Sequence, residues 1–203
     1  MEARNLRTMS LEEYIALDRS GDERLEYVDG EVFVVASRPE HNLVKGKLYI
    51  ALTKALEGNP CLALPDGQKI ATRKTRAYHY PDASVFCGDL MRDPDDDHAL
   101  TNPTLLAEVL SPSTADYDRG GKFVHYRSLP SLREYLIVSI EERTVERYRR
   151  LDSGEWLMSE LHSGALDLAS IDARIVIADL WVDFERLAPG GIDRDPRAPV
   201  PRE

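Results

Sequence analysis

The segment 105–114, with the sequence LLAEVLSPST, restricts the fold of this chain more than any other stretch. Five of its first six residues are apolar, which is typical of a fully buried β-strand, and the remaining one is Glu108. Burying an unpaired carboxylate is strongly unfavourable, so Glu108 must have a partner inside the protein. Either a metal ion or a salt bridge would provide one.

A second acid lies at the start of another predicted strand, in the sequence YPDASVF at positions 80–86. We expect this strand and the Glu108 strand to be neighbours, because sequential strands usually pair if the connecting loop doubles back. Asp82 and Glu108 would then lie close together. Mg²⁺ and Mn²⁺ prefer hard oxygen ligands, so the two carboxylates predict a metal site, to which the backbone carbonyl of Val109 adds a third oxygen.

Lys122 is the cation that we expect to lie beside these acids. It follows Gly120 and Gly121 and opens a predicted helix at 122–128, on which Lys122 and Tyr126 share one face because they are four residues apart. A lysine beside a metal-bound water orients it or stabilises charge on the phosphate oxygens. The three residues Asp82, Glu108 and Lys122 therefore predict hydrolysis of a phosphodiester.

The remaining pattern predicts a mixed fold. Ser10 and Glu13 form a capping box for a short helix that ends at about Leu17, and Asp29-Gly30 is a strong hairpin signal. Apolar residues three and four apart predict a long helix at 41–57, with its lysines on a solvated polar face. Further strands are expected at 61–64, 68–72, 134–140, 144–151 and 156–161, whereas 169–184 is ambiguous between a strand and a helix.

This order of elements is typical of an α/β (α+β) domain with a central mixed β-sheet flanked by helices. We expect a single domain at residues 1–187 and a disordered tail at 188–203, where Pro, Gly, Arg and Asp dominate. No apolar run approaches the length of a membrane span, and the N-terminus lacks the apolar core of a signal peptide, so we expect a cytoplasmic protein.

Charge and cysteine content indicate what kind of surface and which cysteine state to expect. The net charge of −10 argues against a generic polyanion-binding surface, although it allows one basic face. The acidic run at 93–97 is expected to be a solvated loop. Cys61 and Cys87 lack CxxC spacing and lie in apolar segments, so we expect both to be reduced core residues.

The ordered motifs resemble the PD-(D/E)XK nuclease superfamily, and specifically its bacterial Uma-two branch of restriction-endonuclease-like proteins. The motifs that carry the resemblance are YPDASVF, LLAEVLSPST, Asp118 with Lys122 and Tyr126, and REYLIVS. The segments LEEYIALD and RLEYVDGEVFVVA and the helix-opening His41 are also similar to that branch. The resemblance therefore covers about residues 11–161.

The resemblance implies a restriction-endonuclease-like α/β core, a Mg²⁺ or Mn²⁺ ion, and hydrolysis of DNA phosphodiester bonds. It implies that Asp82 and Glu108 are metal ligands and that Glu26 is an additional acid near the metal. His41, Lys69 and Tyr126 are the candidates for contacting the substrate. A homodimer would allow two such sites to act on two strands.

The lysine of the motif is where this chain departs from the superfamily. The pattern expects lysine two residues after Glu108, where this sequence has Leu110. In the branch that the chain resembles, the lysine is relocated to the following helix, so we expect Lys122 to replace it. Lys69, on a preceding strand, is the alternative.

Other interpretations of the same residues stay open. Asp82, Glu108 and Lys122 could form a buried ion cluster with a structural role only, in a catalytically silent nucleic-acid-binding or interaction module. His41 could be an ordinary polar residue at a helix start, and Tyr126 could serve mainly in packing. A hydrolase that acts on a sugar would also use two carboxylates, at a defined spacing and with no metal between them.

Overall fold

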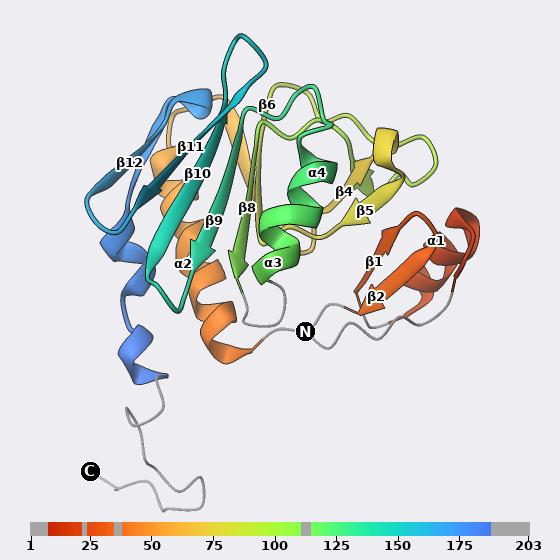
Figure 1. The fold of residues 1–203 in the computed structure, drawn as a ribbon, viewed down its shortest axis with the longest axis horizontal. Helices are drawn as coiled ribbons and strands as arrows, with labels where there is room; N and C mark the ends of the chain where they lie inside the picture. The colour runs from red at the N-terminus through yellow and green to blue at the C-terminus, as the bar shows by residue number, and fades with distance from the viewer. Residues whose placement is uncertain (1–7, 22–23, 35–37, 111–114, 188–203) are drawn as a thin grey trace, which may run out of the picture.

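The chain folds into two main β-sheets with helices packed against them (Figure 1). The computed structural model describes residues 8–21, 24–34, 38–110 and 115–187, so the predicted tail at 188–203 lies outside the described residues. Among the described residues, the strands form a five-stranded, a six-stranded and a two-stranded sheet. The predicted class, a mixed α/β domain, is confirmed.

The five-stranded sheet has the order β2-β1-β5-β4-β7. Its strands are β1 (Leu25–Val28), β2 (Glu31–Val34), β4 (Lys69–Thr72), β5 (Ala77–His79) and β7 (Ala99–Leu100). The predicted hairpin joins β1 to β2, with positive φ at both Asp29 (43°) and Gly30 (102°). Helix α1 (Leu11–Ser20) begins at the predicted capping box and extends three residues beyond Leu17.

The six-stranded sheet has the order β11-β10-β9-β8-β6-β3 and carries the acidic motifs. Its strands are β3 (Cys61–Pro65), β6 (Ala83–Cys87), β8 (Leu105–Leu110), β9 (Glu134–Ser139), β10 (Thr144–Arg150) and β11 (Trp156–Leu161). β8 pairs with β9 in parallel, and with β6 in antiparallel register with Ala83 opposite Ala107. The predicted adjacency of the two acid-bearing strands is therefore confirmed.

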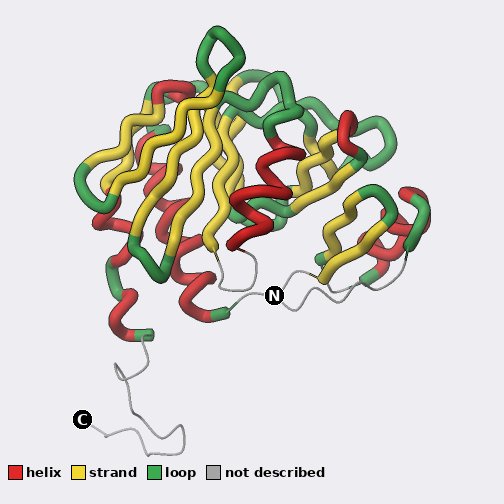
Figure 2. Tube along the Cα trace, in the orientation of Figure 1, coloured by secondary structure: helices red, strands yellow, loops and turns green. Residues whose placement is uncertain are grey.

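The two faces of β8 are covered by different helices, and Figure 2 shows helices on both sides of the sheet. Leu105, Ala107 and Val109 belong to the apolar cluster of α2 (Pro39–Ala55). Leu106 and Leu110 belong to the cluster around Tyr126 instead. Because strand side chains alternate between faces, Glu108 lies on the same face as Leu106 and Leu110.

A continuous helical segment covers the Glu108 face. It consists of α3 (Ala115–Tyr117), the π-helical η2 (Asp118–Lys122) and α4 (Phe123–Tyr126). The prediction that the helix begins at Lys122, after a Gly-Gly break, is wrong. Gly121 instead allows close packing within the helix, because a Cβ there would lie 2.3 Å from the ring of Tyr117.

Three expectations about side-chain environment are also wrong. Cys61 and Cys87 form a disulfide, because the β3–β6 register places them directly opposite each other. Lys45 of α2 is buried rather than solvated. Asp96 is 0% exposed, because the residues just after the acidic run form β7, which pairs with β4 of the five-stranded sheet.

The C-terminal part resolves the ambiguous stretch at 169–184 as a mixture of short elements. β12 (Ala165–Leu168) and β13 (Ala173–Val176) form the two-stranded sheet. The 3₁₀ turns are η1 (Arg73–Thr75), η3 (Ala169–Ile171), η4 (Ile177–Trp181) and η5 (Phe184–Arg186). Of the helices in the described part of the chain, none has the length and apolar character needed to cross a membrane.

The burial of Asp96 generates a prediction about stability. Its carboxylate contacts Lys69 Nζ at 2.7 Å and Arg19 at 2.7 Å. Asp96→Ala leaves the buried Lys69 with a weaker set of partners, so we expect the free energy of unfolding to fall by about 3 kcal/mol. Urea denaturation measures this. The matched variant Asp95→Ala removes an exposed acid from the same loop and should cost less than about 1 kcal/mol; equal losses would show that burial of Asp96 does not stabilise the protein.

Candidate active site

The candidate site lies where the five-stranded and six-stranded sheets meet. β5 ends at His79 and β6 begins at Ala83, so residues 80–82 cross from one sheet to the other and carry Asp82. Glu26 comes from β1 of the first sheet, and Glu108 comes from β8 of the second. The sequence Tyr80-Pro81-Asp82 thus positions its acid at the junction.

Lys122 joins the two sheets through its ammonium group. Its Nζ lies 3.1 Å from Glu26, 3.2 Å from Glu108 and 3.4 Å from Asp118, and the lysine is 4% exposed. Burial alone would lower the pKa of Lys122, but the three carboxylates outweigh it and raise this pKa well above its usual value. The ammonium therefore stays protonated and cannot serve as a general base.

Glu108 has three other carboxylates near it as well as Lys122. Besides Lys122, it accepts a hydrogen bond of 2.7 Å from the hydroxyl of Tyr126. Burial raises the pKa of Glu108; Lys122 opposes this, and nearby Asp82 raises the pKa further, so that it lies well above its usual value. A further cation at this place would favour the ionised form of Glu108.

Glu26 shares Lys122 with Glu108 but has a different environment. It accepts a 3.0 Å hydrogen bond from the backbone N–H of Tyr80, and its other oxygen lies 3.4 Å from His79 Nδ1. Burial tends to raise the pKa of Glu26, but Lys122 and His79 together lower it to about 2. Glu26 is therefore an ionised acid that contacts Lys122 beside Glu108.

Asp82 is fixed by contacts with β8 and α2. It accepts a 2.7 Å hydrogen bond from the N–H of Val109, and the same oxygen lies 3.3 Å from His41 Nε2. Its other oxygen lies 3.6 Å from Lys45 Nζ, which also donates to Asp66 at 3.0 Å. His41 Nε2 contacts the carbonyl of Val109 as well. His41 therefore lies against two of the three predicted metal ligands.

The donor atoms fit a hard divalent cation. Asp82 and Glu108 supply carboxylate oxygens, and Val109 supplies a carbonyl oxygen. Within the described ranges, no three His, Cys, Asp or Glu side chains form a ready-made metal site. Mg²⁺ is usually held by one or two carboxylates, with waters and a substrate phosphate completing its shell, so a two-carboxylate set is sufficient.

The structure shows which of the two candidate lysines lies beside Glu108. Lys69 is buried against Asp18 at 2.5 Å and Asp96 at 2.7 Å, in an ion cluster of its own. Lys122 instead contacts Glu108 directly. Lys122 is therefore the lysine beside the acid motif, and the hydroxyl of Tyr126 reaches the same carboxylate.

Sequence reasoning gave no role in the site to two residues that contact it, although each had a detectable signal. Asp118 lies four residues before Lys122 in a helical segment, and Lys45 lies four residues after His41 in α2, so each shares a helix face with a predicted site residue. A third, His79, had no signal beyond its place just before the Tyr80-Pro81-Asp82 connection.

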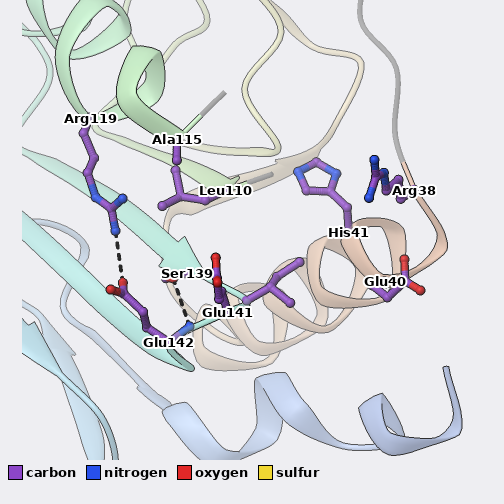
Figure 3. Close-up of a pocket in the computed structure, with 10 residues that line it drawn as sticks. Arg38, Glu40, His41, Leu110, Ala115, Arg119, Ser139, Glu141 and Glu142 are labelled. Carbon is purple, nitrogen blue, oxygen red and sulfur yellow. Dashed lines mark hydrogen bonds and ion pairs between the residues drawn. The ribbon is translucent and has the colours of Figure 1, made fainter. Parts of the chain in front are cut away.

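A pocket of about 460 Å³ opens beside His41, at the carboxyl ends of β8 and β9 (Figure 3). Figure 3 shows Arg119 reaching to Glu142 across the pocket wall, and their side chains lie 3.2 Å apart. The residues that line the pocket are Arg38, Glu40, His41, Leu110, Ala115, Arg119, Ser139, Ile140, Glu141 and Glu142. It contains both cations and acids, and His41 connects it to Asp82.

Comparisons with known proteins place this geometry in context. The family described as "Uma2: Putative restriction endonuclease" matches residues 11–175. An uncharacterized protein of Synechocystis sp. is 36% identical over 165 residues, which cover 80% of this chain and 86% of that protein. A second uncharacterized Synechocystis protein is 30% identical over 150 residues, covering 73% of this chain and 85% of that protein.

A solved structure has the same fold. The crystal structure of "a putative nuclease" from Anabaena variabilis matches with a TM-score of 0.70 and covers 87% of this chain and 99% of that chain. The sequence identity is 16%, so this likeness concerns the fold alone.

The electrostatics of Glu26 generate a prediction about pH. A free glutamate has a pKa of about 4.3, whereas that of Glu26 is lowered to about 2. The ionised carboxylate therefore stabilises the fold above about pH 4.3, and this contribution is lost as the pH falls toward 2. We expect Glu26→Gln to be less stable than the wild type at pH 7, and the difference to shrink below pH 4.3.

Urea denaturation from pH 7 to about pH 3 measures this difference. Glu57→Gln, at an exposed position after α2, is the matched control and should change stability by less than about 0.5 kcal/mol. A difference between Glu26→Gln and wild type that stays constant with pH would contradict the lowered pKa.

Proposed function

Because the chain belongs to the Uma2 family of putative restriction endonucleases, we propose that it is a metal-dependent nuclease that hydrolyses DNA phosphodiester bonds. One observation carries the proposal. Asp82, Glu108 and Lys122, which lie far apart in the sequence, converge at the junction of the two sheets. A nuclease-like protein needs such a group of acids and a cation beside the scissile phosphate.

In this proposal a Mg²⁺ or Mn²⁺ ion is held by Asp82, Glu108 and the carbonyl of Val109. When bound, such an ion polarises the phosphodiester and lowers the pKa of a water molecule. The excess of carboxylates supports the assignment, because Asp82 and Asp118 both raise the pKa of Glu108 despite the contact with Lys122. Glu26 helps to hold Lys122 in place.

The role of Lys122 follows from its protonation state. Because its pKa is raised, it supplies a fixed positive charge and hydrogen-bond donors rather than removing a proton. We assign it to orienting the attacking water and to stabilising negative charge that develops on the phosphate oxygens. It takes the place of the motif lysine that Leu110 replaces.

His41 and the pocket beside it form the proposed approach for the substrate. His41 contacts Asp82 and the Val109 carbonyl on one side and lines the pocket on the other. Arg38 and Arg119 add cations to the pocket wall, and such side chains contact phosphate oxygens in nucleic-acid complexes. In a homodimer, two pockets of this kind would act on the two strands of a duplex.

One observation favours a second function. Three carboxylates already contact the Lys122 ammonium, which is also what a purely structural ion cluster would show. A catalytically silent nucleic-acid-binding module is therefore the competing proposal. The two differ in whether the acids bind a divalent metal.

The test of the nuclease proposal is the variant Asp82→Asn. Its amide oxygen can still accept the hydrogen bond from Val109, but the change removes one negative charge from the proposed ligand set. We expect cleavage of DNA in Mg²⁺ or Mn²⁺ to fall by about 100-fold or more, since a misplaced catalytic group costs on this order. Calorimetry with Mn²⁺ alone should show metal binding to the wild type and little to the variant.

Asp89→Asn is the matched control, because Asp89 is exposed in the loop after β6. It should bind Mn²⁺ and cleave DNA as the wild type does. Cleavage that persists unchanged in Asp82→Asn would contradict the assignment of this site. A wild-type protein that binds DNA, but neither binds Mn²⁺ nor cleaves, would identify the silent module.

A further inference from the structure

A basic recess lies on the surface between α4 and the β10–β11 hairpin, and it shares no residue with the candidate active site. Its volume is about 550 Å³. The residues that line it are Lys74, Thr75, Val124, Arg127, Ser128, Arg150, Gly154 and Trp156. Three of these are cations and none is an acid. The basic recess therefore has the opposite charge to the protein as a whole.

The three cations lack the carboxylate partners that just over half of the basic residues in the described part of the chain have. In the described part of the chain, no carboxylate lies within ion-pairing distance of Lys74, Arg127 or Arg150. Many other arginines do contact one, including Arg19, Arg24, Arg76, Arg119 and Arg143. The chain has 36 acidic and 26 basic residues, so acids to pair with these cations are abundant. Three adjacent cations without an acid indicate a site for an anion.

Arg150 is held in position before any ligand binds. Its guanidinium donates hydrogen bonds to the carbonyls of Pro130, at 3.3 Å, and Arg127, and it lies 4.7 Å from the centre of the Trp156 ring. These contacts use two of its five N–H donors. Burial and the neighbouring Arg133 lower the pKa of Arg150, so the environment favours an added negative charge. A fixed guanidinium loses little entropy when it binds an anion.

The helix that forms one wall of the recess also carries the candidate site. Tyr126 of α4 donates to Glu108, and the next residue, Arg127, lines the recess. On the other wall, Lys74 belongs to η1, which precedes β5 and its buried His79 beside Glu26. The recess is thus next to the candidate site in the fold, on the opposite side of α4.

We propose that the basic recess binds a backbone phosphate of a nucleic-acid strand, at a position outside the candidate metal site. The inference rests on the proposed function, because it assigns this phosphate to the same substrate. Phosphate oxygens accept hydrogen bonds from Arg and Lys, and such contacts position a strand without reading its sequence. Trp156 lines one side of the recess, so its fluorescence can be used to detect a bound ligand.

The first experiment measures DNA binding against salt concentration in EDTA, where no cleavage takes place. Each phosphate neutralised by a protein contributes about 0.9 to the slope of log K against log salt for duplex DNA. We expect the double variant Lys74→Ala/Arg127→Ala to reduce the magnitude of this slope by about 1. Both residues are exposed, so the variant should fold, and a thermal melt checks this.

Lys54→Ala is the matched control for charge, because it removes an exposed lysine near the end of α2. It should leave the slope unchanged. A double variant with the wild-type slope would overturn the inference. Because binding is measured without metal, this result is independent of cleavage. If the wild type cleaves DNA but the double variant keeps the wild-type slope, only the recess proposal is contradicted. If the double variant has a smaller slope but the wild type does not cleave DNA, only the nuclease proposal is contradicted.

The second experiment separates a strand phosphate from a free phosphate. The chain has two tryptophans, so Trp181→Phe leaves Trp156 as the sole tryptophan reporter. Titration with a short DNA strand should change Trp156 fluorescence at far lower concentration than inorganic phosphate does, and Lys74→Ala/Arg127→Ala should weaken the DNA response. Saturation by inorganic phosphate alone, with no response to DNA, would overturn the assignment to a nucleic-acid strand.

Discussion

The buried ammonium of Lys122 is the interaction on which the arrangement of this protein depends. It contacts one carboxylate from β1, one from β8 and one from its own helical segment, so it joins the two sheets and the helix that covers them. A buried charge is tolerated only when its partners surround it, so these elements must assemble together. A well-packed apolar cluster would often be as stable, so the presence of four buried ionisable groups here favours a functional role for them.

Two of the three carboxylates that contact this ammonium, Glu26 and Glu108, have surroundings that shift their pKa values in opposite directions. Glu26 also has the N–H of Tyr80 and His79, which keep it ionised, whereas Glu108 faces the negative charge of Asp82. Residues whose pKa values are separated in this way usually have different roles. Glu26 is suited to fixing Lys122, and Glu108 is suited to binding a further cation.

The sequence predicted the features that local patterns determine. The apolar run around Glu108 and the turn signal at Asp29-Gly30 indicated a buried strand and a hairpin, and both are present. The disulfide between Cys61 and Cys87 depends on the register of two strands, which spacing along the chain does not reveal. Asp96 belongs to an acidic run that is typical of a solvated loop. Its burial depends on Lys69 and Arg19, which come from distant segments of the chain.

The charge distribution restricts how a polyanion can approach this protein. A net charge of −10 repels nucleic acid over most of the surface, so binding requires places where cations are not neutralised by neighbouring acids. The basic recess is such a place, and the His41 pocket, with its mixed charges, is a weaker one. A nucleic-acid strand bound at the recess would be separated from the acidic cluster by α4. The same acids that are suited to a metal ion would repel a phosphate in its absence, which makes substrate binding at the cluster depend on the metal.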